Sequence, residues 1–280
     1  MISKIKSLNE AVNEVKDGMI VAIGGNVLHR APMAFLREIV RKQRKNLKIV
    51  KTAGAHDVDL LCAGNCVDTV DAGFISYETE FGLANYYRKA VESGKIRANE
   101  HACYTVMSAL RAAKAGLNFM PVSGLKVSDL IKENDYFKVI TDPFTGEQVT
   151  VVRSIKPDVA IIHVHECDAY GNAVIYGPRF DDELISLATK KVILTTEKIV
   201  GKGRFSRQPQ NVCIPGFIVD TIVIAPRGSA PCSCPTLYDI DSRVLRDFTQ
   251  NKSTDMLQKY LKHYENKDNQ KVAGVRLGVY

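Results

Sequence analysis

The chain has 280 residues, 45% of them hydrophobic, and a formal net charge of +7 at pH 7. It is long enough to bury a large core, and no segment approaches the roughly 18 consecutive apolar residues that cross a bilayer. The basic charge suits an acidic ligand, but basic residues are not interleaved with exposed aromatics in a known module, so we expect no membrane insertion and no nucleic-acid binding.

The N-terminal stretch MISKIKSLNEAVNEVKDG is a charged amphipathic pattern without the apolar core of a signal peptide. The seven cysteines are odd in number and irregularly spaced. This spacing, in a chain of this size, indicates reduced thiols rather than a disulfide framework. We therefore expect a soluble, cytoplasmic protein.

The first half of the chain alternates strands and helices. A helix over 7–16 precedes an apolar strand, Met19–Ile23, which stops at Gly24-Gly25. Pro32 then opens a pattern of helical period that extends to about Arg44. Further along, the pattern predicts strands over 47–52, 69–76 and 118–122 and helices over 57–62, 82–92 and 102–115.

The second half repeats the alternation, with several strands that are continuously apolar. Such strands are typical of a parallel sheet covered on both faces. We predict an α/β fold with an open, mostly parallel sheet and helices on both faces, in one domain spanning 1–280, with an irregular insertion at about 125–147. The expected elements are strands over 149–152, 158–164, 173–176, 191–195 and 221–225 and helices over 182–189 and 254–264.

The Gly24-Gly25 corner is the first candidate for a binding site. Glycine permits positive φ and close approach of the main chain, and the following helix start adds unpaired N–H donors with a partial positive charge. A corner of this kind occurs in α/β proteins of many functions, so it does not name a ligand by itself.

The stretch Asp17 to Pro32, DGMIVAIGGNVLHRAP, resembles the first-subunit signature of the class I CoA-transferases. Over about the first 240 residues, RKAVESGKI (88–96), RAAKAGLNFMPV (111–122), DVAIIHVHECDAYGNAVIYG (158–177) and VDTIVIAP (219–226) are similar to the alpha subunit of glutaconate CoA-transferase. The resemblance implies that family's α/β fold and coenzyme A as acyl-CoA substrate. It also implies a beta-subunit partner, in a heterodimer or an α2β2-type heteromer.

In this family a glutamate from the second subunit is the covalent nucleophile that attacks the acyl-CoA carbonyl, within a Glu-Asn-Gly or Glu-Gly-Gly motif. The nearest string here, Glu92-Ser93-Gly94, is interpreted as the end of a helix. The resemblance thus implies that Gly24 and Gly25 supply anion-stabilising donors while the partner supplies the nucleophile. The predicted function is transfer of CoA between an acyl-CoA and a carboxylic acid.

A second reaction is compatible with the same scaffold. PMAF (32–35), LLCAGN (60–65) and Phe180-Asp181-Asp182 are similar to the alpha subunits of CoA-thioester hydrolases that open the last steroid rings. Carbon–carbon hydrolysis of a cyclic ketone CoA thioester is therefore the alternative.

Three positions depart from the transferase pattern. Asn26 replaces Phe, and its amide either binds a substrate carboxylate or carbonyl or makes a local backbone bond. Glu78 replaces Ser, and is either a substrate-facing group that would repel a dicarboxylate or a surface carboxylate. Cys103 replaces the transferases' Gln and the hydrolases' Glu, and is either a thiol of lowered pKa at a helix start or a small buried hydrophobe. Glu100 is the fallback acid–base candidate.

Basic and metal-ligating residues complete the candidates. Arg30 and Arg179 are placed to contact an anionic substrate or CoA, or to form ion pairs. His163, His165 and Cys167 alternate along one strand and so share a face, but no second ligand cluster supports them, and Cys232-Ser233-Cys234 lacks the partners of a zinc site. No metal is expected.

Overall fold

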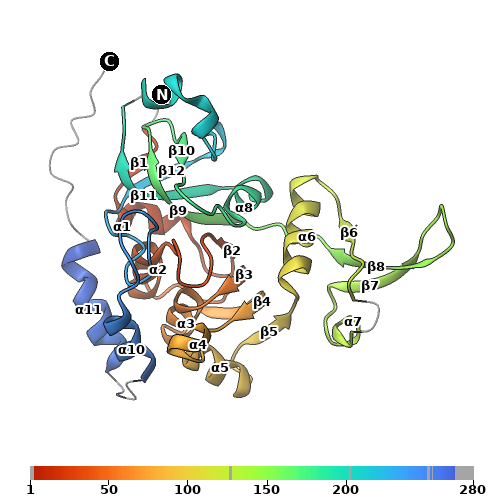
Figure 1. The fold of residues 1–280 in the computed structure, drawn as a ribbon. Helices are drawn as coiled ribbons and strands as arrows, with labels where there is room; N and C mark the ends of the chain where they lie inside the picture. The colour runs from red at the N-terminus through yellow and green to blue at the C-terminus, as the bar shows by residue number, and fades with distance from the viewer. Residues whose placement is uncertain (1–2, 126–127, 202, 251–252, 254, 269–280) are drawn as a thin grey trace.

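The structure is a computed structural model that describes residues 3–125, 128–201, 203–250, 253 and 255–268. Its centre is a nine-stranded sheet in the order β1-β12-β11-β9-β2-β3-β4-β5, with β10 alongside β9 (Figure 1). Neighbouring strands along this path are parallel, and β10 pairs with β9 in the antiparallel sense. The predicted open, mostly parallel sheet is confirmed.

Most strands of this sheet coincide with predicted segments. β1 and β5 are exceptions. β1 has two residues and β5 has the polar sequence RANE, so neither has a periodic apolar pattern that could predict a strand. The bounds are β1 (Ile5–Lys6), β2 (Ile20–Ile23), β3 (Leu47–Gly54), β4 (Val67–Ile75), β5 (Arg97–Glu100), β9 (Val159–Cys167), β10 (Ala173–Val174), β11 (Val192–Ile199) and β12 (Thr221–Ile224).

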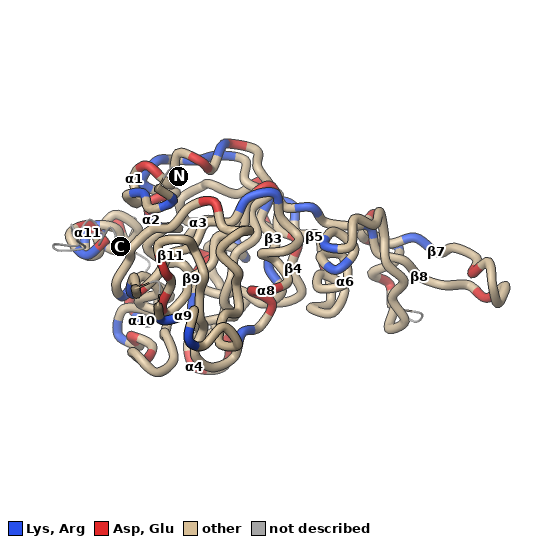
Figure 2. Tube along the Cα trace, turned by 90° about the horizontal axis from the view of Figure 1, so that it is seen from above, with Lys and Arg blue, Asp and Glu red and all other residues tan. Residues whose placement is uncertain are grey.

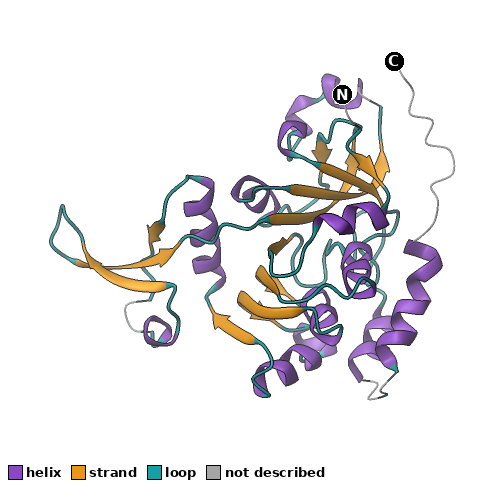
Figure 3. Cartoon of the chain, turned by 180° about the vertical axis from the view of Figure 1, so that it is seen from behind, coloured by secondary structure: helices purple, strands orange, loops and turns teal. Residues whose placement is uncertain are grey.

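Helices cover both faces of the sheet, and each face has its own buried core (Figures 1 and 3). The first core packs α1 (Leu8–Ala11), α2 (Met33–Arg41), α3 (His56–Ala63), α4 (Glu78–Phe81), α5 (Asn85–Glu92), α10 (Ser242–Gln250) and α11 (Met256–Asp268). The second packs α6 (Cys103–Lys114) and α8 (Asp182–Ala188). A short α9 (Gly203–Arg207) and 3-10 turns at Val12–Glu14, Pro209–Asn211 and Gly216–Ile218 complete the elements.

The predicted helix over 7–16 is shorter than expected. Ser7 and Glu10 form a capping box that starts α1, but the helix tightens to a 3-10 turn at Val12. Thr254, the expected start of the last helix, lies outside the described residues, and α11 begins at Met256. No helix among the described residues is long and apolar enough to span a membrane.

The segment 125–147, expected to be irregular, instead contains α7 (Leu130–Glu133) and β7 (Phe137–Thr141). With β6 (Phe119–Pro121) and β8 (Gln148–Arg153), β7 forms an antiparallel sheet in the order β6-β8-β7. Residues 119–125 and 128–153, which we call the arm, extend away from the main body on the far side of α6 (Figures 1 and 3). Acidic and basic residues are interspersed over the body and both occur on the arm (Figure 2).

Candidate active site

The Gly24-Gly25 corner lies at the carboxyl ends of the parallel strands, where open α/β sheets bind their ligands. Gly25 has φ +74°, and a Cβ there would lie 2.4 Å from the carbonyl oxygen of His29. A Cβ on Gly24 would lie 2.6 Å from Oδ1 of Asp182. Close packing on both sides therefore requires glycine at both positions.

The backbone N–H groups of the corner already have acceptors within the chain. Gly24 donates to the carbonyl of Ile161 at 2.9 Å, and Gly25 donates to Oδ1 of Asp182 at 2.7 Å. Asn26 donates to the carbonyl of His29 at 2.9 Å. The expectation that Gly24 and Gly25 present free donors to an anion is thus corrected, because an anion at Gly25 would have to displace Asp182.

Asp182 is held in this position by Arg30. Arg30 Nη1 donates to Asp182 Oδ2 at 2.5 Å and Nη2 donates to the carbonyl of Pro178 at 2.8 Å, while the guanidinium lies 5.4 Å from the centre of the Phe180 ring. Both side chains of the ion pair are fully buried. Of the two alternatives for Arg30, an ion pair or contact with an anionic ligand, the structure shows an ion pair, although a buried one and not one at the surface. Arg30 therefore supports the corner from inside the protein.

Lys51, on β3, binds the carbonyl groups of the corner. Its buried ammonium donates to the carbonyls of Ile23, Gly24 and Gly25 at 3.2, 2.6 and 2.8 Å, and lies 3.2 Å from Oδ2 of Asp57. Charge-assisted bonds to three successive carbonyls fix the backbone of the corner. Lys51 is not among the residues predicted from the sequence, although a lysine inside the apolar strand LKIVKT was an available signal.

Asp181 lies beside this group and is 4% exposed. Its Oδ2 accepts a bond from Thr52 Oγ1 at 2.7 Å, whereas its Oδ1 has no hydrogen-bond partner among the described residues. Burial raises the pKa of the Asp181 carboxyl; Lys51 opposes this effect and the adjacent carboxylate of Asp182 reinforces it. Two neighbouring aspartates thus have different environments, one ion-paired and one incompletely bonded.

Cys103 is joined to the same group through Thr52. It is the first residue of α6, as predicted, and its half-buried thiol donates to the carbonyl of Thr52 at 3.3 Å. Burial raises the pKa of the Cys103 thiol, and the charge of Asp181 raises it further. This environment favours the neutral thiol and not the activated thiolate.

The remaining candidates lie near the carboxyl ends of strands: Asn26 in the loop after β2, Glu78 at the start of α4 after β4, and Glu100 as the last residue of β5. Asn26 is half-buried in a tight turn with His29, while Glu78 and Glu100 are exposed. Glu78 begins α4 with φ +61°, a conformation unusual for a residue other than glycine. Among the described residues no hydrogen bond or ion pair connects the Glu78 or Glu100 side chain to Asp181 or Asp182.

A group able to hold a metal occurs one strand away, and it differs from the one considered in the sequence. The ligand atoms of His163, Glu197 and Cys234 lie within 4.8 Å of one another. His163 Nε2 is 2.9 Å from Glu197 Oε1, and Tyr238 and the backbone of Arg227 also donate to Glu197. Such a nitrogen, oxygen and sulfur set is of the zinc type, but the carboxylate is already used by three donors of the chain.

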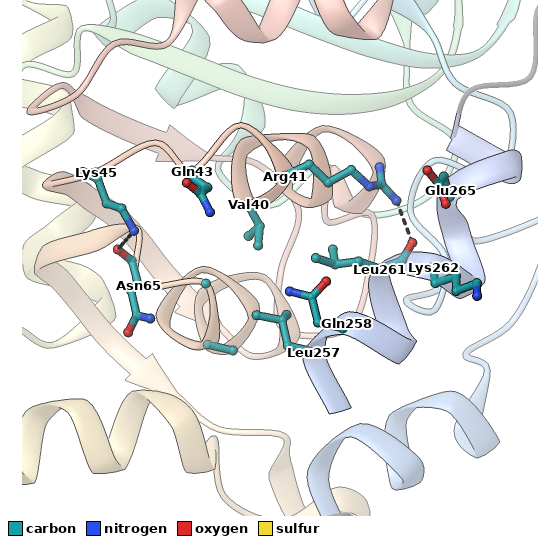
Figure 4. A pocket seen from close by; sticks show the side chains of 12 residues that line it. Val40, Arg41, Gln43, Lys45, Asn65, Leu257, Gln258, Leu261, Lys262 and Glu265 are labelled. Atoms are coloured by element: carbon teal, nitrogen blue, oxygen red, sulfur yellow. Dashed lines mark hydrogen bonds between the residues drawn. The ribbon is translucent and has the colours of Figure 1, made fainter. Parts of the chain in front are cut away.

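A hollow of about 600 Å³ lies between α2, α3 and α11 (Figure 4). It lies near the amino end of β3, whereas the corner lies at the carboxyl ends of the strands. Two of its polar side chains are engaged, since Arg41 donates to the carbonyl of Leu261 at 2.9 Å and Lys45 to that of Asn65 at 3.3 Å. It belongs to the packing of the C-terminal helix.

Comparison with known proteins decides the family. Residues 5–225 match the coenzyme A transferase family. The chain belongs to this family. In structure it resembles glutaconate coenzyme A-transferase from Acidaminococcus fermentans, with a TM-score of 0.89 and 30% identity over 94% of this chain and 88% of that one. The resemblance to a class I CoA-transferase alpha subunit is confirmed.

The relatives within the coenzyme A transferase family carry different activities. The A-type subunit of glutaconate CoA-transferase from A. fermentans is 32% identical, over 90% of this chain and 84% of its own length. The cholesterol ring-cleaving hydrolase IpdA subunit of Rhodococcus jostii is 30% identical, over 89% and 86%. The crystal structure of a variant of the decarboxylase AibA/AibB superposes with a TM-score of 0.86 and 31% identity, over 95% of this chain and all of that one.

One relative is longer than this chain. An uncharacterised protein of Archaeoglobus fulgidus is 36% identical over 93% of this chain, which spans 60% of that protein's length. The family and the fold are therefore shown, while the activity of the whole protein is a matter of proposal.

Proposed function

We propose that this chain is the alpha subunit of a cytoplasmic, heteromeric CoA-transferase that moves CoA between an acyl-CoA and a carboxylic acid, and that it is active only with a beta subunit. The observation that carries the proposal is the chain-long similarity to glutaconate CoA-transferase in both sequence and fold. CoA enters as the thioester substrate.

The carboxylates at the corner support a nucleophile from outside the chain. Asp182 is fully buried in its ion pair with Arg30, and Asp181 is nearly inaccessible. Attack requires reacting atoms about 3 Å apart, and neither carboxylate can come that close to a thioester carbonyl without leaving its place. The corner then serves as a rigid wall of the site, and the partner's glutamate forms the covalent intermediate.

The test is reconstitution with the protein encoded beside this chain. The two subunits are purified separately and together, and acetyl-CoA is offered with a panel of carboxylic acids while new acyl-CoA is measured by mass spectrometry. We expect transfer only in the mixture. Borohydride should label one glutamate of the partner when acyl-CoA is present, and a fully active complex that is never labelled would contradict a glutamyl thioester.

Hydrolysis is the second candidate, favoured by the IpdA similarity and by the incompletely bonded Asp181 within Phe180-Asp181-Asp182. It predicts that water adds across a ring carbon–carbon bond, which breaks while the thioester stays intact. A cyclic ketone CoA thioester should therefore become a ring-opened carboxylic acid that still carries CoA and is heavier by one water, as followed by mass spectrometry. Carbon dioxide release would instead support decarboxylation. The Cys103→Ala variant of the same complex separates an inert thiol, with unchanged turnover, from a catalytic one.

A further inference from the structure

The arm ends in an open strand. In the sheet order β6-β8-β7, β7 is at the edge, and within the described residues no other strand pairs with it. An unpaired edge with exposed apolar side chains is a template for another strand. Val139 is 49% exposed, Ile140 36%, and Phe144, at the tip of the hairpin, 95%.

The register of the hairpin shows which backbone groups are open. Arg153 donates to the carbonyl of Tyr136, and Asp142 donates to that of Glu147, both at 2.8 Å. Even-numbered residues of β7 therefore direct their N–H and C=O groups toward β8, and Val139 and Thr141 direct theirs toward the open edge.

This edge is complementary to itself. If two copies of β7 run antiparallel about a two-fold axis at Ile140, Val139 lies opposite Thr141 of the other copy. These are the residues whose backbone groups are open, so each such pair can exchange both hydrogen bonds.

The charges fit the same register. Lys138 comes to lie opposite Asp142 of the second copy, on the face that carries Ile140; Lys138 is exposed and Asp142 is half-buried. A hydrogen bond from the backbone of Phe144 lowers the pKa of the Asp142 carboxyl, so it is charged at neutral pH. Figure 2 shows basic residues near β7 and acidic residues near the hairpin end.

We propose that the arm is a self-association surface on which β7 of a second copy of this chain pairs about a two-fold axis at Ile140, joining the two small sheets into one. The proposal does not depend on which reaction the enzyme catalyses. It supplies an alpha-to-alpha contact for an α2β2-type assembly.

The sharpest test is a cysteine at the axis. Residues directly opposite in a non-hydrogen-bonded pair have Cα atoms about 4.5 Å apart, within the range that a disulfide requires. The full-length Ile140→Cys variant should therefore form a covalent dimer under mild oxidation, seen on a non-reducing gel. Val139→Cys is the matched control, because that residue faces Thr141 and not its own copy. The native thiols are buried apart from half-buried Cys103, so the wild type gives the background.

Charge exchange tests the register separately from folding. Lys138→Glu should at least halve the dimer fraction measured by light scattering, and so should Asp142→Lys, because each places like charges opposite one another. The double variant should restore the dimer. A wild-type chain that stays monomeric at high micromolar concentration, with an unlinked Ile140→Cys variant, would overturn the proposal. So would Ile140→Cys linking to the beta subunit instead of to itself.

Discussion

Two buried polar clusters, one before helix α2 and one at its centre, are built in different ways. The anchor cluster, at the centre of the helix, joins Arg37 to the C-terminal helices. Arg37 donates to both carboxylate oxygens of Asp268 at 2.8 and 2.6 Å and to the carbonyl of Ala230 at 2.6 Å. His56 bonds the hydroxyls of Tyr77 and Tyr260, each at 2.8 Å.

The corner cluster, before the helix, is less complete. Its members are Arg30, Lys51, Asp181 and Asp182, and two of their buried atoms, Arg30 Nε and Asp181 Oδ1, have no hydrogen-bond partner among the described residues. By contrast, every buried polar side-chain atom named in the anchor cluster has a hydrogen-bond partner among the described residues. Because an unmet buried bond costs about 1–3 kcal/mol, it persists where another requirement maintains it.

Burial and charge alone therefore do not identify a site. Both clusters contain buried arginines and carboxylates, and both connect segments that are far apart in sequence. A fully bonded cluster stabilises the fold, whereas an incompletely bonded one at the carboxyl ends of the strands is the place to expect chemistry.

The largest effect is expected at the corner itself. Gly25→Ala places a Cβ within 2.4 Å of a backbone carbonyl, in addition to its positive φ, so the free energy of unfolding should fall by about 5 kcal/mol. Gly18→Ala is the matched control, because Gly18 has φ +78° with open space around it. That change should cost about 1 kcal/mol. Urea unfolding measures both, and equal losses would show that conformation and not close packing requires glycine.

The next effect belongs to the anchor cluster. Arg37→Ala leaves the buried carboxylate of Asp268 with Arg41 as its remaining partner and removes the donor to the Ala230 carbonyl, so it should destabilise the protein by about 3 kcal/mol. Arg88→Ala removes an exposed pair with Glu92 and should change stability by less than about 0.5 kcal/mol. Assays below the unfolding transition should show that kcat of the reconstituted enzyme is retained in both variants. A large loss of kcat in Arg37→Ala would place the anchor cluster in the active machinery.

The smallest change in stability is expected at Asp181. Its folded pKa is raised, so its protonated form favours folding at low pH and this contribution is lost as the pH rises through that folded pKa. Asp181→Asn should therefore raise the melting temperature by about 1–2 °C at pH 7, and by less at pH 4. The kcat of the reconstituted enzyme should fall, because substitutions that stabilise a functional site commonly lower its activity.

Asp182→Asn is the contrasting change for the same measurement. It removes the ion pair with buried Arg30 and should lower the melting temperature. If Asp181→Asn were the less stable variant, or fully active, the distinction between a structural and a functional aspartate would be lost.

Much of the fold can be predicted from the sequence because its strands and helices have strong periods. The predicted bounds agree closely with those of β2, β3, β9 and α2. The strands have continuous or alternating apolar residues, and the helix has apolar residues every three to four positions. α10 escapes prediction, because SRVLRDFTQ is mostly polar and buries only Leu245 and Phe248. The arm has an irregular pattern in the sequence because its turns and charges obscure the alternation in β7.

The site can be predicted only in part for a different reason. Gly24 and Gly25 are recognisable because their chemistry is local to the chain. Lys51 and Asp181 act through contacts made across the sheet, at separations of 26 to 28 residues for the Lys51 carbonyl bonds and 129 for the bond between Thr52 and Asp181. No local pattern reveals such a contact.

The anchor cluster also sets an order of events during synthesis. Helix α2 begins directly after the corner, yet the carboxylate that neutralises its Arg37 belongs to Asp268, 231 residues later. A nascent chain on the ribosome therefore carries an unpaired arginine in this helix until nearly all of the described chain has been made. The packing of α2 against α11 can therefore be completed only after Asp268 has been synthesised, and a chain truncated before Asp268 should lack this pair.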